Sequence, residues 1–380
     1  MLFEKIKNRI DRYYKLLFNS FVLKFFSYAK DFELFSDDLY RCDTVLDEFK
    51  RFVSNNNDVT YSVELQEIPK SKVAHKWVGA QFFNDAIVGI PNDEESVLIK
   101  REHWTSQHVA EKGRFKWTGG CVWNSRLYCF PRTSNNFLVY DGKKAELIQL
   151  DFKYDIEHHY SGVLCDELGV VYQPPRNTNH ILKTDLNTNH SKKILIASEH
   201  LNCKLSYCGS VRHPNGYIYF LPVSGCKVIK LNPLTDDWCF IGKPITTFCF
   251  DAKVGGDGNI YGFNHWKGIV KIDVQNNKVS NIHTDIRFYS YGTKIGLNGK
   301  LYSIPGDSCS VFEYDIQTDS VKVVYTVQSK NEAKFAGGVT DVNGFIYGVP
   351  AEEEMVICYK PSRVERIPKS IYQKIYLDSY

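Results

Sequence analysis

From about residue 60 onward, short apolar runs alternate with turns rich in glycine, asparagine and aspartate, and one order of features recurs seven times. In the clearest copy, the pair Gly119-Gly120 precedes the turn Asn124-Ser125, an apolar pair that ends in Tyr128, and then Pro131. Aligning the copies on this tyrosine gives Val88, Tyr128, Tyr172, Tyr219, Tyr261, Tyr302 and Tyr347. These positions lie 40 to 47 residues apart. A period of this length, built from short strands, is typical of a β-propeller.

Each copy divides into four strands. The first two form a hairpin, and the Asn-Gly pairs that begin at Asn215, Asn298 and Asn343 suit a two-residue turn in which both residues have positive φ. Proline ends the second strand because it cannot donate to the ladder. An aspartate-led turn joins the third strand to the fourth. We therefore expect an all-β fold, a seven-bladed β-propeller of four-stranded blades, with an N-terminal α-helical extension.

The ring needs a fourth strand for its last blade, and two segments compete for that place. Tyr61–Leu65 precedes the first copy, whereas Arg363–Ile367 follows the last. The upstream segment stands about as far before Gly79 as Val323, in a predicted fourth strand, stands before Gly337 (16 against 14 residues). The spacing therefore favours Tyr61–Leu65, paired with the third strand of the seventh blade around Met355–Tyr359.

The repeats resemble kelch-type and related propeller repeats in their glycine pair, hairpin, second-strand aromatic and aspartate turn. The resemblance covers roughly residues 60–365 and departs from kelch in lacking a regular tryptophan late in each unit, since Trp238 is isolated. It implies a propeller that serves as a binding platform.

Three segments follow from the repeat: an N-terminal helical extension (residues 1–58), the propeller (59–368) and a C-terminal tail (369–380). Apolar residues recur at helical spacing up to Phe26, among more basic than acidic residues. Three interpretations remain for this extension. It is a helical hairpin packed on the propeller or on another subunit, a membrane-surface helix that uses residues 1–30, or a mitochondrial targeting segment. Glu4 and Asp11 weigh against the last of these.

Composition is that of an ordinary globular protein. The net charge is +3 and no basic stripe runs through the repeats, which argues against nucleic acid as a partner. The 11 cysteines are odd in number and include no CxxC pair, so neither a disulfide framework nor a zinc site is expected. Many of them fall in predicted strands as buried free thiols, which indicates a reducing intracellular compartment, cytoplasmic rather than mitochondrial.

Catalytic and cofactor motifs are scarce. His158-His159 has no accompanying metal-ligand pattern, and Gly255 to Gly258 precedes a strand instead of the helix that a phosphate loop requires. The run Glu352 to Glu354 fits a solvated acidic loop. We therefore expect no cofactor, no metal and no catalytic residues.

The loops between second and third strands vary in sequence on a regular frame, as recognition loops do on a rigid scaffold. One arc of this face is basic and the other acidic, and the first and seventh blades should bring their acidic loops together. The predicted partner-binding residues are Arg132, Arg176, Lys227, His265, Trp266, Lys267, Glu94, Glu352 and Glu353.

An aromatic residue also stands at the start of most first strands. Either these rings pack between blades, or they form stacking platforms at the channel mouth: Trp77, Trp117, Tyr160, Tyr207 and Phe335. The sequence thus favours a non-catalytic scaffold that binds a protein partner or a larger complex. The alternative is a small-molecule or glycan-binding propeller, or a propeller enzyme, that uses the central channel.

Overall fold

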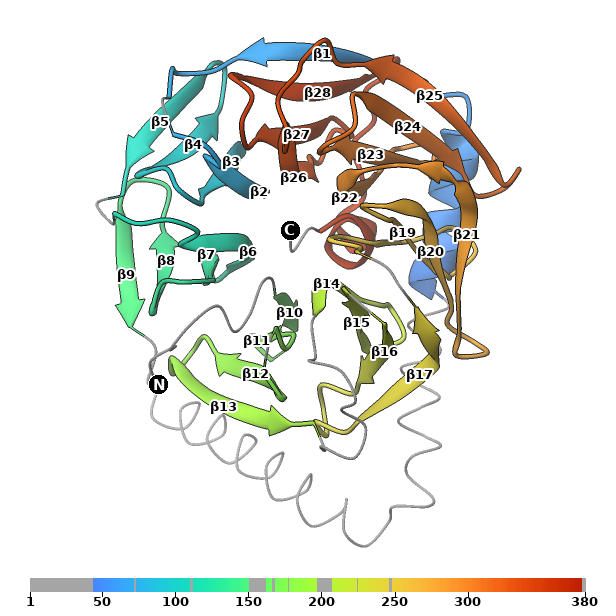
Figure 1. Ribbon diagram of the computed structural model, residues 1–380, viewed down its shortest axis with the longest axis horizontal. Helices are drawn as coiled ribbons and strands as arrows, with labels where there is room; N and C mark the ends of the chain where they lie inside the picture. The colour runs from blue at the N-terminus through green and yellow to red at the C-terminus, as the bar shows by residue number, and fades with distance from the viewer. Residues whose placement is uncertain are drawn as a thin grey trace, which may run out of the picture.

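A computed structural model describes residues 44–71, 73–109, 112–149, 162–165, 168–176, 178–196, 207–223, 225–245 and 248–377. In this part of the chain, seven four-stranded antiparallel sheets stand around a common centre (Figure 1). The all-β propeller expected from the sequence is therefore confirmed, as is a helix before it, at residues 44–55.

The strands follow the chain round the ring. Blade 1 consists of β2 (Trp77–Phe83), β3 (Ala86–Pro91), β4 (Ser96–Lys100) and β5 (Trp104–His108), and blade 2 of β6 (Trp117–Trp123), β7 (Arg126–Pro131), β8 (Asn136–Tyr140) and β9 (Ala145–Gln149). Blade 3 consists of β10 (Val163–Cys165), β11 (Val170–Gln173), β12 (His180–Asp185) and β13 (His190–Leu195), and blade 4 of β14 (Tyr207–Arg212), β15 (Ile218–Pro222), β16 (Cys226–Leu231) and β17 (Trp238–Ile245). Blade 5 consists of β18 (Lys253–Val254), β19 (Ile260–Phe263), β20 (Lys267–Asp273) and β21 (Lys278–Arg287), and blade 6 of β22 (Ser290–Ile295), β23 (Leu301–Pro305), β24 (Ser310–Asp315) and β25 (Ser320–Thr326).

Blade 7 joins the two ends of the ring. It contains β26 (Phe335–Thr340), β27 (Ile346–Pro350), β28 (Met355–Pro361) and, as its outer strand, β1 (Tyr61–Glu67). The register runs antiparallel from Tyr61 opposite Pro361 to Glu67 opposite Met355. The predicted closure is confirmed, and the competing segment after β28 forms no strand.

The aligned tyrosines hold the blades together. From Tyr128 to Tyr347 their side chains are buried, and Tyr172, Tyr219 and Tyr302 are fully enclosed. The glycines of the first strands allow close approach near the axis. A Cβ on Gly338 would lie 2.0 Å from the carbonyl oxygen of Tyr347, so no other residue fits there.

The hairpin turns correct one sequence prediction. Both central residues have positive φ at Asn84-Asp85 and Asn124-Ser125, as in a two-residue turn. At the Asn-Gly pairs only the glycine does, with φ of 87° at Gly216. The loop there is longer and closes with a bond from the His213 N–H to the Tyr217 carbonyl. Asparagine instead accepts a bond from the backbone N–H two residues on, which favours the longer loop.

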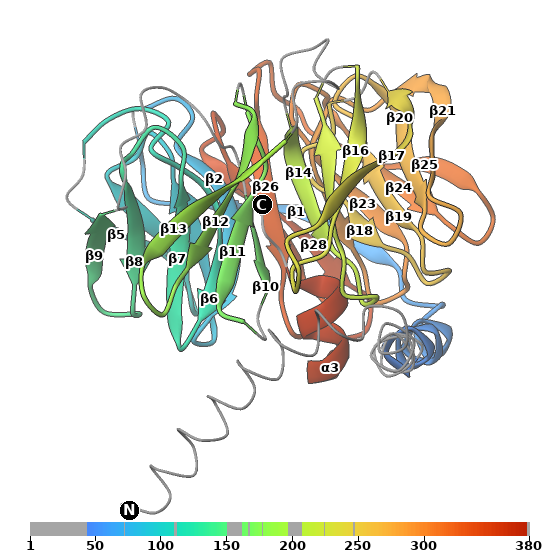
Figure 2. The same ribbon diagram turned by 90° about the horizontal axis from the view of Figure 1, so that it is seen from below.

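The propeller has two distinct faces. We call the loop face the one formed by the loops between second and third strands and by the segments that enter the first strands. The turn face carries the hairpin turns, and helices cover part of it (Figure 2). There the C-terminal segment forms α3 (Lys369–Ile371) and the π-helix η2 (Tyr372–Tyr376), so the expected tail is a folded element.

The C-terminal helix packs firmly against the ring. The hydroxyl of Tyr372 donates to the Thr340 carbonyl in blade 7, and that of Tyr376 donates to the Gly296 carbonyl in blade 6. Phe49 of the helix at 44–55 packs edge-on against Tyr376, with ring centroids 6.0 Å apart. The helix at 44–55 and the C-terminal helix therefore support each other on the turn face. The earlier residues of the extension, including 1–30, lie outside the described residues.

Candidate functional site

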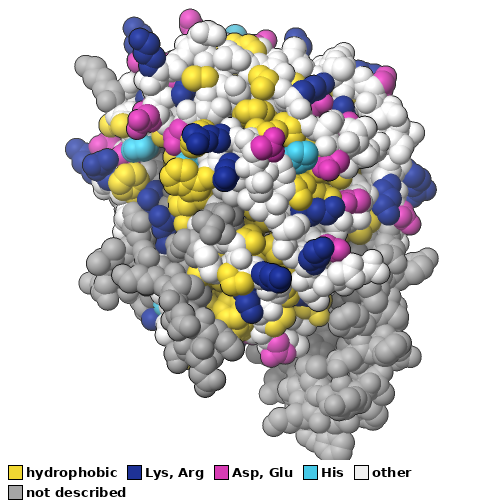
Figure 3. Space-filling model, turned by 45° about the vertical axis from the view of Figure 1, so that its right-hand side comes forward, with side chains coloured by type: hydrophobic (Ala, Val, Ile, Leu, Met, Phe, Trp, Pro, Cys, Tyr) yellow, Lys and Arg dark blue, Asp and Glu magenta, His cyan; other side chains and the backbone are white. Residues whose placement is uncertain are grey.

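The predicted partner-binding residues lie on the loop face, but they differ in exposure. Lys227, Trp266 and Lys267 are exposed, and Arg176, Glu94 and Glu352 are half-buried. The other three, Arg132, His265 and Glu353, are buried. Side chains of both charges and exposed apolar groups are interspersed over the side of the molecule in Figure 3.

Arg132 is held inside its blade. Its guanidinium lies over the ring of Phe115, 4.5 Å from the centroid, while Arg114 lies 5.0 Å from the same centroid. Its backbone N–H donates to the Lys116 carbonyl. A cation packed in this way contributes to the loop's stability, so Arg132 is less available for steering a partner than its sequence position indicates.

The acidic loops of blades 1 and 7 converge on Lys76, as the ring order predicts. The Nζ atom of Lys76 donates to the Glu352 carbonyl oxygen at 3.1 Å, and His75 Nε2 lies 3.9 Å from a Glu352 carboxylate oxygen. Burial lowers the pKa of Lys76, and the nearby carboxylates, with Glu94 and Glu354 among them, oppose this shift. Glu353 instead accepts bonds from Ser329 and Asn331, which fix the loop between blades 6 and 7.

Lysines before the first strand fasten neighbouring blades. The Nζ atom of Lys116 donates to the carbonyl oxygens of Asn92, Glu94 and Gly113 at 2.9 to 3.1 Å. Lys334 makes a bond that corresponds to the one between Lys116 and Gly113. Its Nζ atom donates to the carbonyl oxygen of Asn331, and in both cases the acceptor stands three residues before the lysine. These buried ammonium groups satisfy loop carbonyls and so give the loop face a rigid frame.

The aromatic residues at the first-strand starts lie in the interior, which corrects the stacking-platform hypothesis. Trp77 and Trp117 are 1% and 0% exposed, and Tyr207 and Phe335 are fully buried. The indole N–H groups of Trp77 and Trp117 donate to the carbonyls of Ser96 and Asn136, and the Tyr207 hydroxyl donates to that of Lys227. These rings hold the first strand to the start of the third. Tyr160 lies outside the described residues.

Aromatic rings gather instead where blades 5 and 6 meet on the loop face. We call this cluster the blade 5–6 patch; it consists of Phe248, Phe250, His265, Trp266, Tyr289, Tyr291 and Asp307. The His265 ring stacks on Tyr291 with centroids 4.8 Å apart and planes 12° apart. Trp266 is 57% exposed, unlike the buried tryptophans of blades 1 and 2. The patch therefore presents one aromatic surface to solvent on a packed base.

His265 forms the centre of the patch. Its Nε2 atom lies 3.4 Å from a carboxylate oxygen of Asp307, while Nδ1 is buried without a hydrogen-bond partner. Burial lowers the pKa of His265, and the negative charge of Asp307 opposes that shift. The imidazole is thus favoured in its neutral form.

A buried ion pair joins the same two blades nearer the axis. Lys294 Nζ donates to a carboxylate oxygen of Asp251 at 2.5 Å, and Lys253 Nζ lies 3.7 Å from the other oxygen. All three side chains are buried. The sequence analysis did not identify this pair, because nothing in the repeat marks residues that face each other across blades.

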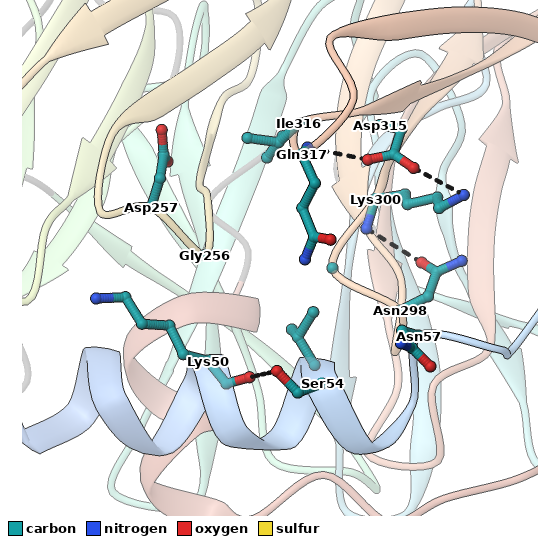
Figure 4. Close-up of a pocket in the computed structure, with 12 residues that line it drawn as sticks. Lys50, Ser54, Asn57, Gly256, Asp257, Asn298, Lys300, Asp315, Ile316 and Gln317 are labelled. Carbon is teal, nitrogen blue, oxygen red and sulfur yellow. Dashed lines mark hydrogen bonds and ion pairs between the residues drawn. The ribbon is translucent and has the colours of Figure 1, made fainter.

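A pocket of about 420 Å³ lies on the turn face, between the helix at 44–55 and blades 5 and 6 (Figure 4). Several polar side chains of its walls already form ion pairs or hydrogen bonds within the protein. Lys300 Nζ lies 3.1 Å from a carboxylate oxygen of Asp315, and the Asp257 carboxylate accepts from Tyr261 and Asn259. Fewer of its side chains are therefore left to bind a ligand than in the blade 5–6 patch.

Two negative findings concern the residues that the structure describes. No three His, Cys, Asp or Glu side chains come together there in a way that could hold a metal ion. No helix among the same residues has the length and apolar character needed to cross a membrane.

The fold defines the class of protein as a seven-bladed β-propeller. No family model matches the chain, and no curated protein matches it in sequence. The kelch-type resemblance therefore stays a prediction.

Solved structures resemble it in fold. Virginiamycin B lyase from Staphylococcus aureus with quinupristin superposes with a TM-score of 0.66 at 11% identity, over 79% of this chain and 99% of that one. YCF48 bound to D1 peptide gives a TM-score of 0.55 at 12% identity, over 79% and 94%. Likeness at this level of identity shows the shared fold alone.

Proposed function

We propose that this propeller is a protein-interaction module that binds a segment of a partner protein on its loop face. Trp266, in the blade 5–6 patch, is the central residue of the contact. The observation that carries the proposal is the exposure of Trp266 on an otherwise packed cluster. Tryptophan and tyrosine are enriched among the residues that dominate binding energy at interfaces. The rigid base beneath Trp266 reduces the entropy lost on binding.

Two further observations support the same proposal. Elsewhere on the loop face, Lys116 fixes loops of blades 1 and 2, and Lys334 fixes the loop between blades 6 and 7, so the face is organised before a partner arrives. YCF48, a propeller of similar fold, binds D1 peptide, and this supports the proposal that a peptide segment is the ligand.

Peptide display gives a direct test. A random peptide library is selected on the wild-type protein, and the enriched peptides are measured against Trp266→Ala and the control Leu195→Ala, which removes a side chain 65% exposed on β13 of blade 3. We expect Trp266→Ala to weaken binding by about tenfold or more and Leu195→Ala to leave it unchanged. Equal binding to the wild type and Trp266→Ala would refute the site.

A catalytic function is the second candidate, and His265 is the observation behind it. Its Nε2 atom lies beside the Asp307 carboxylate and Nδ1 is left without a hydrogen bond; because Nδ1 is buried, it could act as a general base only if a substrate displaced the rings around it. A propeller of similar fold is a lyase whose histidine-to-alanine variant is described as catalytically inactive. Incubation with quinupristin, with His265→Ala as control, tests this candidate: conversion of quinupristin by the wild type alone would support it, and no conversion would exclude this substrate.

A further inference from the structure

The walls of the blade 5–6 patch define the chemistry of its ligand. Trp266 and Tyr289 lie with ring centroids 6.4 Å apart and planes 63° apart, so their faces form a corner. The His265 ring closes the base of the corner, 5.4 Å from Trp266 and 5.9 Å from Tyr289. Aromatic faces carry partial negative charge and attract cations, with tryptophan the strongest.

A carboxylate stands at the same corner. One oxygen of Asp307 accepts the Ala333 N–H at 3.0 Å, and the other lies 3.4 Å from His265 Nε2. The Asp307 side chain remains 35% exposed, so it reaches solvent beside the rings. Since the buried imidazole is favoured in its neutral form, the corner as a whole is negative.

The neighbouring loops extend this charge. Glu354 of blade 7 is exposed, and Glu332, which precedes the first strand of that blade, is exposed as well. Exposed basic groups also lie on these loops: Lys267 follows Trp266 in the chain, Arg287 pairs with Lys267 in the sheet, and Lys330 stands two residues before Glu332. An acidic ligand would meet two aromatic faces and a carboxylate, and a neutral apolar one would leave Asp307 without a charged partner.

We propose that the corner formed by Trp266, Tyr289 and Asp307 binds a basic side chain, Lys or Arg, of the partner segment. The cation lies against the indole and phenol faces and pairs with the carboxylate. This inference rests on the proposed function, since it names what the interaction module recognises.

Small probes test the corner without knowledge of the partner. The six tryptophan indole N–H signals of ¹⁵N-labelled protein are observed by NMR, and Trp266 is assigned from Trp266→Phe. The protein is titrated with N-acetyl-arginine amide and N-acetyl-lysine amide, and in parallel with N-acetyl-citrulline amide, which has nearly the shape of the arginine probe without its charge. We expect saturable shifts of the Trp266 signal with the two cations and none with citrulline.

Charge variants separate the contributions. Asp307→Asn keeps an oxygen for the Ala333 N–H and removes the charge, so it should weaken arginine binding about fivefold. Lys267→Ala removes a positive charge beside the corner and should strengthen arginine binding. Equal shifts with citrulline, or no effect of Asp307→Asn, would overturn the inference.

The peptides selected by display distinguish this failure from failure of the proposed function. If they bind in a Trp266-dependent manner but tolerate replacement of every Lys and Arg by glutamine, the interaction module stands and the basic-residue inference fails. If they bind independently of Trp266, the proposed function itself fails at this site.

Discussion

His213 makes the stability of this propeller depend on pH in a way that can be measured. The side chain lies at the turn face between blades 4 and 5, and it is buried. Its Nε2 atom is 2.9 Å from the carbonyl oxygen of Gly258, and its Nδ1 atom is 3.1 Å from the backbone nitrogen of Asn215. A carbonyl only accepts and a backbone N–H only donates, so Nε2 carries the proton and Nδ1 does not. Both bonds are made by the neutral imidazole.

The size of the effect follows from the pKa. Burial lowers the pKa of His213 from 6.5 to about 4, and the hydrogen bond to the Gly258 carbonyl opposes this shift only partly. As pH falls, the unfolded chain takes up a proton near 6.5 and the native protein does so only near 4. The contribution of His213 to stability is therefore complete above pH 6.5 and is lost as pH falls toward 4. At about 1.4 kcal/mol per pKa unit, the loss is about 3 kcal/mol.

The assay is urea unfolding of wild type and His213→Gln at pH values from 7.5 to 4. The difference in unfolding free energy between the two proteins isolates His213, since other groups titrate in both. This matters because burial raises the pKa of Asp341 to about 6, and that carboxyl stabilises the native state as pH falls. We expect the difference to shift by about 3 kcal/mol against the wild type between pH 7 and pH 4. A difference that stays constant over this range, or a His213 NMR titration near 6.5, would refute the reasoning.

Three further predictions concern closure, packing and thiols. A chain that begins at residue 68 lacks β1 and should melt at a lower temperature than one that begins at residue 44. A synthetic peptide of residues 44–67 should restore the melting temperature, and failure to restore it would contradict the closure by β1. Gly338→Ala should destabilise the fold by about 1–3 kcal/mol in urea unfolding, whereas Gly256→Ala, with open space around its Cβ and no positive φ, should be neutral; equal stability of the two variants would count against the close approach. Cys239 is exposed and should react with a thiol reagent before the buried Cys121 and Cys129, because burial raises the pKa values of those two thiols. Peptide mapping by mass spectrometry gives the order of modification, and early modification of Cys121 would contradict its burial.

The repeat could be predicted from the sequence because each blade buries the same kind of side chain at the same place. The second-strand tyrosines and the first-strand glycines are local consequences of one geometry, and they mark the blades even at low similarity between copies. Closure by Tyr61–Glu67 was predictable for a related reason, since the phase of the repeat assigns that segment to an outer strand.

Contacts between blades were harder to predict. His265, Trp266 and Asp307 were each recognisable as loop residues, but their meeting depends on how two blades pack, which no spacing in the sequence records. The first-strand aromatics were ambiguous because an exposed and a buried ring look alike in sequence. The buried Trp117, held by a bond to the Asn136 carbonyl, shows which of the two the packing selects.

The closure of the ring in blade 7, where β1 pairs with β28, also bears on how the protein is synthesised. Strand β1 leaves the ribosome early, and its partner β28 follows about 290 residues later. At about 5–20 residues per second, β1 therefore waits roughly 15–60 s for the strand it pairs with. During that interval six blades can form in order, each from consecutive strands, while the ring stays open and the edge of β1 stays unpaired. Such an edge can pair with another chain, so the pairing of β28 with β1 ends the risk of association between nascent copies.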